Sequence, residues 1–330
     1  MSKENILTEN LLTVKDLEVH FPYKESYFSL KKKYVYAVDG VSFVLKKGET
    51  LGVVGESGCG KTTLGMAIIN LVAPTAGSVF YKDRDITNIY QYPLKERMEF
   101  QKKIQIIFQD PYSSLNPKMT LNRIIGDPLK IHGIPKKERE ERIADVLTRV
   151  DLTPEHGHRF PHQFSGGQRQ RIGIARSLAL QPNIIIGDEP VSALDVSIQA
   201  QVINLLIRLQ KEFNLSYIFI AHDLAVIEHI SDRIAVMYLG KIVELAEAKE
   251  IYQNPKHPYT KALLSAIPIP NPKKKAARII LEGDVPGPRN PPSGCSFHPR
   301  CPSRFTGCDE TAPSLQEVGK SHFTACHLYD

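Results

Sequence analysis

The sequence predicts an α/β fold with a mainly parallel sheet, and three observations lead to that prediction. Short apolar runs typical of strands alternate with helical patterns through the middle of the 330-residue chain. A glycine-rich loop separates a strand-like run that ends at Val54 from a helical pattern over residues 62–71. Strand signals are missing between residues 110 and 164. Together these features indicate an α/β core that carries a helical insertion.

The elements of the core follow from hydrophobic periodicity. Apolar and polar residues alternate over 11–21, and a second strand-like run at 41–45 completes an expected antiparallel β layer. Within the insertion, residues 136–150 predict one charged amphipathic helix between Pro135 and Pro154. Four further strands and one long helix of the core are expected, at 104–108, 184–186, 217–220, 234–238 and 198–213.

Beyond about Asn254 prolines become frequent and the periodicity is lost, which indicates a small C-terminal appendage. We therefore expect a nucleotide-binding core with its antiparallel layer over 1–109 and 165–253, a helical subdomain over 110–164, and a C-terminal extension over 254–330. An apolar content of 42% allows this chain to bury a substantial core.

Composition excludes several classes of protein. No apolar run approaches the roughly 18 residues that span a bilayer. The first ten residues carry charges of both signs and lack the apolar stretch of a secretory signal, so we expect a cytoplasmic protein. The net charge of +6 comes from basic residues that are interleaved with acidic ones, and no nucleic-acid partner is expected.

The glycine-rich loop fits the pattern G-x-x-x-x-G-K-[ST] in the context of a strand and a helix, which indicates a P-loop that binds ATP and Mg²⁺. Glycines allow backbone N–H groups to turn inward around the phosphates, Lys61 reaches the β and γ phosphates, and the Thr62 hydroxyl ligates Mg²⁺. We interpret Cys59 as filling a variable position rather than as a redox sensor. The expected phosphate-binding residues are Gly55, Glu56, Ser57, Gly58, Cys59, Gly60, Lys61, Thr62 and Thr63.

A second signal stands at the end of the buried strand that starts at Ile184. Two acids, Asp188 and Glu189, follow it directly, at a strand end where a carboxylate can meet Mg²⁺. Asp188 is expected to order the magnesium shell. Glu189 is expected to act as general base or as positioning residue for the water that attacks the γ-phosphate. A simple helix start is the structural alternative, and the P-loop makes it the weaker one.

The octapeptide FSGGQRQR over residues 164–171 resembles the signature sequence of ABC-transporter ATPases. Ser165 and Gln168 also fit a capping box for the helix that follows, and both interpretations can hold together. The resemblance implies that two such domains stack head to tail. Ser165, Gly166 and Gly167, with Gln168 beside them, would then offer N–H groups and a helix dipole to the γ-phosphate held by the partner's P-loop.

Three smaller matches fall in the same order as in that family. Gln109 resembles the Q-loop glutamine, which touches Mg²⁺ or the attacking water. Asp195 ends the SALD sequence that resembles the D-loop, and His222 resembles the switch histidine that contacts the γ-phosphate. The aromatic residue that stacks on adenine is expected to be Tyr36, with Tyr23 and Tyr34 as competitors.

The resemblance extends into a peptide-transporter branch through residues 108–117, 188–202 and 254–263 and through the cysteine-containing tail. The likeness is to the second ATPase subunit of bacterial oligopeptide and dipeptide importers. It implies a homologous second ATPase, two transmembrane permease subunits, and an extracellular or periplasmic substrate-binding protein, with this chain at the cytoplasmic face of the membrane. A nickel or other solute importer of the same branch is the alternative. A soluble ABC-type ATPase is less favoured, because the chain has neither two ATPase halves nor a long coiled-coil insertion.

Four cysteines in the tail, spaced C-x₅-C-x₆-C-x₁₇-C, suit a metal group in a cytoplasmic protein better than disulfides. Four thiolates can hold a [4Fe–4S] cluster or Zn²⁺, and this spacing matches neither common pattern. Nearby histidines keep a mixed zinc site open, and reduced or disulfide-linked cysteines are the third possibility. The resemblance to dipeptide-importer ATPases favours the cluster, in a structural role. The residues are Cys295, Cys301, Cys308 and Cys326.

Overall fold

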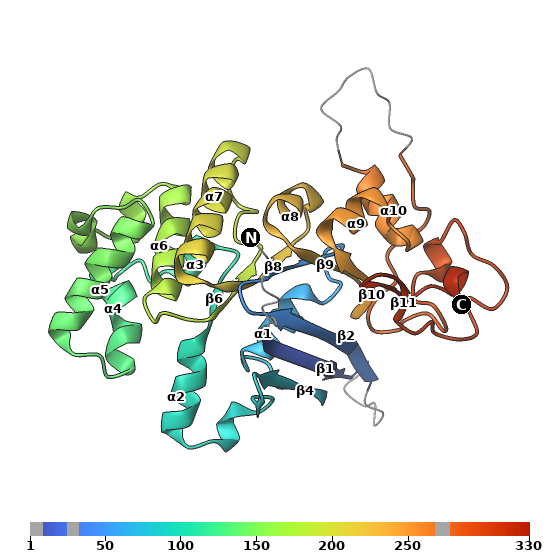
Figure 1. The fold of residues 1–330 in the computed structure, drawn as a ribbon, viewed down its shortest axis with the longest axis horizontal. Coiled ribbons are helices and arrows are strands. Elements are labelled where there is room, and N and C mark those ends of the chain that lie inside the picture. Colours follow the sequence, from blue (N-terminus) through green and yellow to red (C-terminus); the bar gives the residue numbers. More distant parts are fainter. Residues whose placement is uncertain (1–8, 25–32, 268–277) are drawn as a thin grey trace, which may run out of the picture. The chain divides into compact units, whose positions relative to one another are not determined.

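The computed structural model, drawn in Figure 1, describes residues 9–24, 33–267 and 278–330. These residues divide into two compact units. Residues 1–8, where no secretory signal is expected, lie outside the described residues. We call the part that holds 9–10, 45–49 and 88–220 the signature unit. The part that holds 11–24, 33–44, 50–87, 221–267 and 278–330 is the P-loop unit. The three-part division expected from the sequence stays a prediction.

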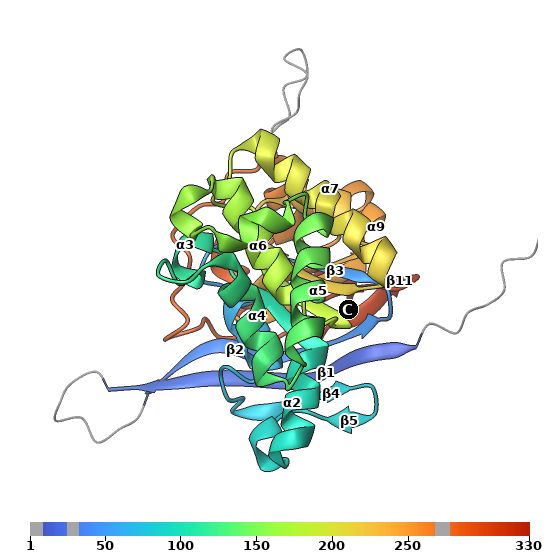
Figure 2. The same cartoon turned by 90° about the vertical axis from the view of Figure 1, so that its left-hand side faces the viewer.

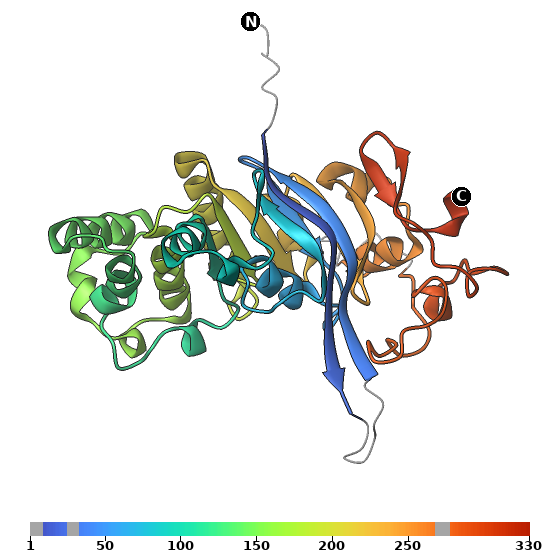
Figure 3. The same cartoon turned by 90° about the horizontal axis from the view of Figure 1, so that it is seen from below.

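An antiparallel sheet with the strand order β2-β1-β4-β5 belongs to the P-loop unit. Its long strands are β1 (Asn10–Tyr23) and β2 (Lys33–Lys46), which run side by side in Figure 3. β1 pairs with β4 (Ala76–Tyr81), and β5 (Arg84–Asp85) forms the edge. The predicted antiparallel layer is confirmed. β2 starts eight residues before the predicted run at 41–45, because only that part of the strand alternates clearly between apolar and polar residues.

The second sheet of this unit starts from β3 (Thr50–Val54), which is buried throughout and pairs in parallel with β9 (Arg233–Tyr238). β9 pairs antiparallel with β10 (Lys241–Glu247), and a C-terminal hairpin of β11 (Gln316–Gly319) and β12 (His322–Thr324) adds to β10. β10, β11 and β12 were not predicted from the sequence. The two C-terminal strands are only three or four residues long, too short to establish a periodicity.

Four helices complete the P-loop unit. They are α1 (Lys61–Ile68), α8 (Leu224–Ile230), α9 (Ala248–Gln253) and α10 (Pro258–Ser265). α1 is shorter than the predicted 62–71, because Asn70 adopts a left-handed conformation with φ of 61° and its side chain donates a hydrogen bond to the Ile86 carbonyl at 2.8 Å. Two 3₁₀ turns, His298–Arg300 and His327–Tyr329, lie in the tail.

The signature unit contains three parallel strands, β6 (Ile104–Ile107), β7 (Ile184–Asp188) and β8 (Ser216–Ala221), as predicted. Residues 110–164, all of which are described, contain helices and 3₁₀ turns but no strand. The predicted amphipathic helix is α5 (Lys136–Arg149), which lies beside α4 (Leu121–Ile131) in Figure 2. The other helices are α2 (Leu94–Lys103), α3 (Pro111–Ser114), α6 (Gly166–Leu178) and α7 (Val196–Phe213). Its 3₁₀ turns are Ile89–Gln91, Pro154–His158 and Pro161–Gln163.

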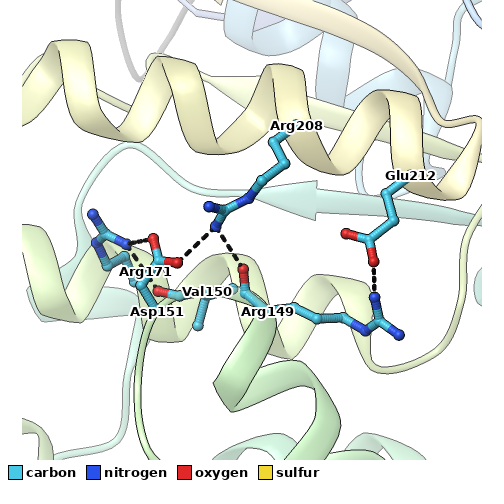
Figure 4. A network of polar contacts seen from close by, with 6 residues as sticks. All are labelled: Arg149, Val150, Asp151, Arg171, Arg208 and Glu212. Carbon is cyan, nitrogen blue, oxygen red and sulfur yellow. Dashed lines mark hydrogen bonds and ion pairs between the residues drawn. The ribbon is translucent and has the colours of Figure 1, made fainter.

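A network of charges joins the end of α5 to α6 and α7 (Figure 4). The Asp151 carboxylate, just after α5, accepts hydrogen bonds from Arg171 on α6 and from Arg208 on α7, the latter at 2.8 Å. The same two guanidinium groups donate to the carbonyls of Val150 and Arg149, at 3.0 and 2.9 Å. Arg171 is the last residue of the FSGGQRQR sequence. This end of the motif therefore has a structural role.

None of the helices within 9–24, 33–267 and 278–330 is both long enough and apolar enough to span a bilayer.

A buried carboxylate fixes the C-terminal hairpin and the start of α10 to β10. Glu244 on β10 is fully buried and accepts hydrogen bonds from the backbone N–H groups of Lys256 and His257, at 2.7 and 3.0 Å. Its side chain also pairs with His322 Nε2 of β12 at 2.7 Å. Burial acts to raise the pKa of Glu244, but the hydrogen bonds from His322 and from the two N–H groups outweigh it, so the pKa is lowered.

His257 beside this carboxylate predicts how stability depends on pH. The side chain is 1% exposed, and its Nδ1 accepts the Tyr259 N–H at 3.1 Å as the N-cap of α10. Burial lowers the pKa of His257 to about 4, although Glu244 opposes the shift. The unfolded chain, with a histidine pKa of about 6.5, therefore binds the proton first, and stability is lost as the pH falls from about 6.5 towards 4.

We expect His257→Asn, which keeps an N-cap acceptor but does not titrate, to remove about 2 kcal/mol of the stability difference between pH 7 and pH 5. Thermal and urea unfolding at the two pH values measure this difference. His229→Asn, at an exposed position of α8, is the control. Equal pH dependence in wild type and His257→Asn would show that His257 does not control acid stability.

Candidate functional site

The P-loop joins β3 to α1 through a turn that only glycine can make. Gly60, the N-cap of α1, has a φ of 103°, and a Cβ atom at this position would lie 1.9 Å from the Ala37 carbonyl oxygen. The loop therefore passes directly against the backbone of β2. This close approach gives the structural reason for the glycine of the predicted motif.

Lys61 is held inside the loop that precedes it. The side chain is 5% exposed, and its ammonium group donates to the carbonyls of Gly55 and Glu56 at 2.7 and 3.0 Å. Cys59 Sγ lies 3.8 Å from the same ammonium group. Burial raises the pKa of Cys59 by more than Lys61 lowers it, so the thiol stays protonated near neutral pH. A neutral buried thiol agrees with a filling role for Cys59.

The outer face of the loop is tied to the rest of the P-loop unit. The Glu56 N–H donates to Tyr259 Oη at 2.9 Å, and the Gly240 N–H donates to the Cys59 carbonyl at 2.9 Å. The Glu56 carboxylate accepts hydrogen bonds from both Nη atoms of Arg300, at 2.7 and 3.2 Å. Sequence reasoning missed these contacts, because a motif does not indicate which distant residues surround it.

The carboxylates lie at the end of β7, as predicted. Asp188 is its last residue and is 4% exposed. Glu189 follows in a left-handed conformation with φ of 45°, although it is not a glycine. Its N–H donates to the Ile220 carbonyl at 2.9 Å, and its own carbonyl accepts the N–H and Oγ of Ser192 at 3.2 and 3.1 Å. Such a backbone costs about 1–3 kcal/mol and persists only where its surroundings determine it, typically at functional sites.

Glu189 also meets the predicted Q-loop residue. Gln109 Nε2 donates to Glu189 Oε2 at 3.1 Å, so the structure brings together two side chains that are 80 positions apart. An amide that holds one carboxylate oxygen restricts the rotation of the carboxylate. This arrangement suits a carboxylate that must face one particular water molecule.

The capping box predicted in the FSGG sequence is confirmed. Ser165 Oγ accepts the Gln168 N–H at 3.3 Å, and Gln168 Oε1 accepts the Ser165 N–H at 3.0 Å. Gly166 and Gly167 form the first turn of α6, and a Cβ atom on Gly167 would lie 2.5 Å from Ile198 Cγ2. These contacts hold the first turn of α6 in place, and with it the N–H groups at the N-terminus of the helix.

Asp195 has a similar local role at the start of α7. Its carboxylate accepts the Ile198 N–H at 3.0 Å and the Ser197 hydroxyl at 2.8 Å. The hydrogen bond from Ser197 is the main reason that the pKa of Asp195 is lowered. Within the signature unit, Asp195 therefore acts as a charged N-cap of α7.

The remaining predicted residues lie in the P-loop unit. Ser57, Gly58 and Thr62 are exposed, and Thr63 follows on the first turn of α1. His222 is exposed directly after β8. The structure fixes Lys61 within its loop in one unit, and it brings Gln109 and Glu189 together in the other.

The three candidate aromatic residues differ in their surroundings. Tyr36 is half-buried on β2, its ring lies 4.6 Å from His20 in an edge-on contact, and its N–H donates to the Pro288 carbonyl at 2.9 Å. The Arg289 guanidinium covers the ring of Tyr23 at 5.0 Å. Tyr34 is 37% exposed. Stacking of Tyr36 on adenine stays a prediction.

The four tail cysteines are free thiols within one small region. The Cys295 N–H donates to the Cys308 carbonyl at 2.8 Å. Burial raises the pKa of Cys295, Cys301 and Cys326, and repulsion between neighbouring thiolates raises it further. Among the described residues, however, no group of three or more His, Cys, Asp or Glu side chains is arranged to hold a metal ion. The geometry therefore does not support the predicted iron–sulfur or zinc site.

Comparison with known families and proteins identifies the family of this chain. The family model described as ABC transporter matches residues 38–192, and that described as oligopeptide/dipeptide transporter, C-terminal region, matches residues 243–308. The chain is 54% identical over 324 residues to the oligopeptide transport ATP-binding protein AppF of Bacillus subtilis (strain 168), covering 97% of this chain and 98% of that relative. The chain belongs to the ATP-binding proteins of ABC transporters.

Other members of this family agree. The dipeptide transport ATP-binding protein DppF of Escherichia coli (strain K12) is 48% identical over 330 residues, covering 100% of this chain and 97% of that relative. A dimeric, post-hydrolysis structure of the ATP-binding cassette MJ0796 bound to ADP and Pi matches with a TM-score of 0.62 and 27% identity, covering 72% of this chain and 98% of that one. CbiO1 from Clostridium perfringens, part of the ABC transporter complex cbiONQ, matches with a TM-score of 0.63 and 26% identity, covering 74% and 92%. As an ABC ATPase, the chain takes MgATP as its substrate and hydrolyses ATP.

Proposed function

We propose that this chain supplies the ATP-driven step of a bacterial importer for oligopeptides or dipeptides. The observation that supports this most strongly is the match to the oligopeptide/dipeptide transporter C-terminal region over residues 243–308. In addition, two relatives that are 54% and 48% identical to this chain are named for oligopeptide and dipeptide transport. An ABC domain alone would indicate ATP hydrolysis without a transported solute. The C-terminal region assigns the solute class.

The proposed assembly contains a second homologous ATPase, two transmembrane permease subunits and an extracellular or periplasmic substrate-binding protein, with no nucleic acid. This chain would work at the cytoplasmic face of the membrane. Support comes from the peptide-transport relatives and from the dimeric state of the MJ0796 cassette.

Within this chain, the P-loop would bind the phosphates of MgATP. The backbone N–H groups over residues 55–63 and the start of α1 would surround them. Lys61 would exchange its present acceptors, the carbonyls of Gly55 and Glu56, for β and γ phosphate oxygens. Thr62, Asp188 and Gln109 would face the Mg²⁺ of the substrate, and the ring of Tyr36 would face adenine.

Hydrolysis would depend on the orientation of Glu189. The left-handed backbone and the hydrogen bond from Gln109 hold this carboxylate in one direction, which suits a group that positions a water molecule and takes its proton. His222 would hydrogen-bond the γ-phosphate and complete the geometry.

The signature residues would act on the partner's ATP. Because their side chains cap α6, Ser165 and Gln168 keep its first N–H groups in place, and the N–H groups of Gly166 and Gly167 in this first turn would face the phosphate. Asp195, at the start of α7, would lie at the same junction between subunits. Each complete site would then combine the P-loop of one chain with the signature of the other.

Glu189→Gln tests the hydrolytic role. We expect this variant to bind MgATP with unchanged affinity and to lose about 10²- to 10⁴-fold in kcat, because the amide keeps the shape but cannot accept the proton. The purified, assembled transporter is assayed for phosphate release and nucleotide binding. Lys61→Ala should lose nucleotide binding instead, and Glu310→Gln at an exposed tail position should leave both measurements unchanged. Wild-type turnover by Glu189→Gln would remove the base role from Glu189.

Two variants test whether each ATP site is shared between the two ATPase subunits. Ser165→Arg should block hydrolysis at the partner's P-loop by filling the approach to the γ-phosphate, whereas Lys61→Ala should prevent binding at this chain's own P-loop. Photocrosslinking of labelled ATP, followed by identification of the labelled chain, resolves the sites. Finding both defects at one and the same P-loop would contradict the head-to-tail arrangement.

We further propose that Cys295, Cys301, Cys308 and Cys326 bind a [4Fe–4S] cluster in a structural role, with Zn²⁺ as the alternative. Four thiols within residues 295–326 have the right chemistry for either group. The support comes from the residue types and from the resemblance, because the described arrangement forms no ready metal-binding group. A bound group would cross-link a proline-rich tail that has little core of its own.

Anaerobic purification followed by iron, sulfide and zinc analysis tests this proposal. We expect about four iron and four sulfide per chain, and a loss of both in Cys308→Ser but not in Cys59→Ser. One zinc per chain without iron assigns the site to zinc, and the absence of both metals shows that the cysteines have no metal-binding role.

A further inference from the structure

The C-terminal segment 288–300 contacts three places around the P-loop and the strands beside it. The Pro288 carbonyl accepts the Tyr36 N–H, and Arg289 covers the ring of Tyr23. Arg300 reaches the P-loop itself through Glu56. The sequence separates Arg300 from Glu56 by 244 positions, so this contact exists only in the folded chain.

Glu56 is held on its side chain and on its backbone at once. Arg300 donates to both carboxylate oxygens at 2.7 and 3.2 Å, and Tyr259 Oη accepts the Glu56 N–H at 2.9 Å. The Glu56 carbonyl, in turn, accepts the Lys61 ammonium at 3.0 Å. A single residue therefore connects Arg300 to the lysine that the P-loop motif requires.

The position of Arg300 is determined by packing. Phe297, three residues before it, is 1% exposed and its ring lies 5.2 Å from Tyr238, 5.3 Å from Tyr259 and 5.6 Å from His257. A 3₁₀ turn, His298–Arg300, follows directly. Arg300 cannot move away from the loop without disturbing this buried aromatic cluster, because only the short turn separates it from Phe297.

An ordinary surface ion pair would contribute little, but this pair differs from that case. The Arg300 side chain is 8% exposed and the Glu56 side chain 26% exposed, and the two-pronged geometry fixes the plane of the carboxylate. Tyr259, which holds the backbone of Glu56, belongs to the same cluster as Phe297. Two independent contacts thus hold one corner of the loop.

We propose that Arg300 is a positioning residue for the P-loop, and that the C-terminal segment through it sets the affinity of this chain for MgATP. The inference rests on the proposed nucleotide-binding role of the loop. Arg300 touches no phosphate in this scheme. It holds Glu56, and thereby the backbone of the loop, in the conformation that receives the phosphates, so that less ordering is required when MgATP binds.

Binding of a fluorescent ATP analogue with Mg²⁺ to the full-length chain tests the proposal. We expect Arg300→Gln to weaken binding by about 10-fold and Tyr259→Phe by a smaller factor, while Arg304→Gln at an exposed tail position binds as wild type does. In the assembled transporter, Arg300→Gln should raise KM for ATP with little change in kcat. A role only in stability would lower the unfolding temperature and leave both binding and KM unchanged.

Conservative and double variants complete the test. Arg300→Lys can make only one of the two contacts and should bind with intermediate affinity, and it decides the question if Arg300→Gln does not fold. Glu56→Gln combined with Arg300→Gln should weaken binding no more than the stronger single change. Wild-type affinity in a folded Arg300→Gln or Arg300→Lys variant overturns the positioning role. Loss of binding in Lys61→Ala would then still support the P-loop itself, so the two proposals fail separately.

Discussion

A loop that surrounds phosphate groups with its own backbone has to give up side chains where it turns, and this constraint organises the P-loop unit. At Gly60 a Cβ atom would collide with the Ala37 carbonyl of β2. The turn can be this tight because β3 delivers the chain from a fully buried strand and α1 receives it at Lys61. Lys61 then satisfies two carbonyls of the loop that precedes it. Strand, turn, lysine and helix are therefore a single structural unit.

The signature unit is subject to a different constraint. It must fix the direction of the Glu189 carboxylate, whereas the P-loop presents N–H groups to phosphates. Glu189 adopts a backbone conformation that an L-residue rarely occupies, and hydrogen bonds to Ile220 and Ser192 keep it there. The cost of this conformation is met by the surrounding strands. Gln109 fixes the side chain on the other side. A freely rotating carboxylate would lose this direction.

Local sequence predicted the elements whose pattern lies within one segment. The strand, P-loop and helix around Lys61, the parallel strands β6 to β9, and the capping box of Ser165 with Gln168 all follow from neighbouring residues. The hairpin of β11 and β12 did not, because strands of three or four residues show no periodicity.

Contacts between residues far apart in the sequence could not be predicted from such local patterns. The strain at Glu189 depends on a carbonyl from a neighbouring strand, and the contact of Arg300 with Glu56 depends on the course of the whole chain. The cysteine tail shows the opposite case, since its residue types suggested a metal and the arrangement of the described residues gives no ready metal group. Residue type indicates which chemistry is available, and only the fold decides which side chains meet.

The pairing of β3 with β9 has a consequence for biosynthesis. Leu51 lies opposite Arg233 and Val54 opposite Val236, so roughly 180 residues separate the strand that carries the P-loop from this neighbour. At bacterial translation rates of about 5–20 residues per second, β3 leaves the ribosome roughly 10–35 s before β9 is made. During that interval a mainly apolar strand edge has no partner from this pairing. The nascent chain is thus exposed to aggregation at the element on which ATP binding depends.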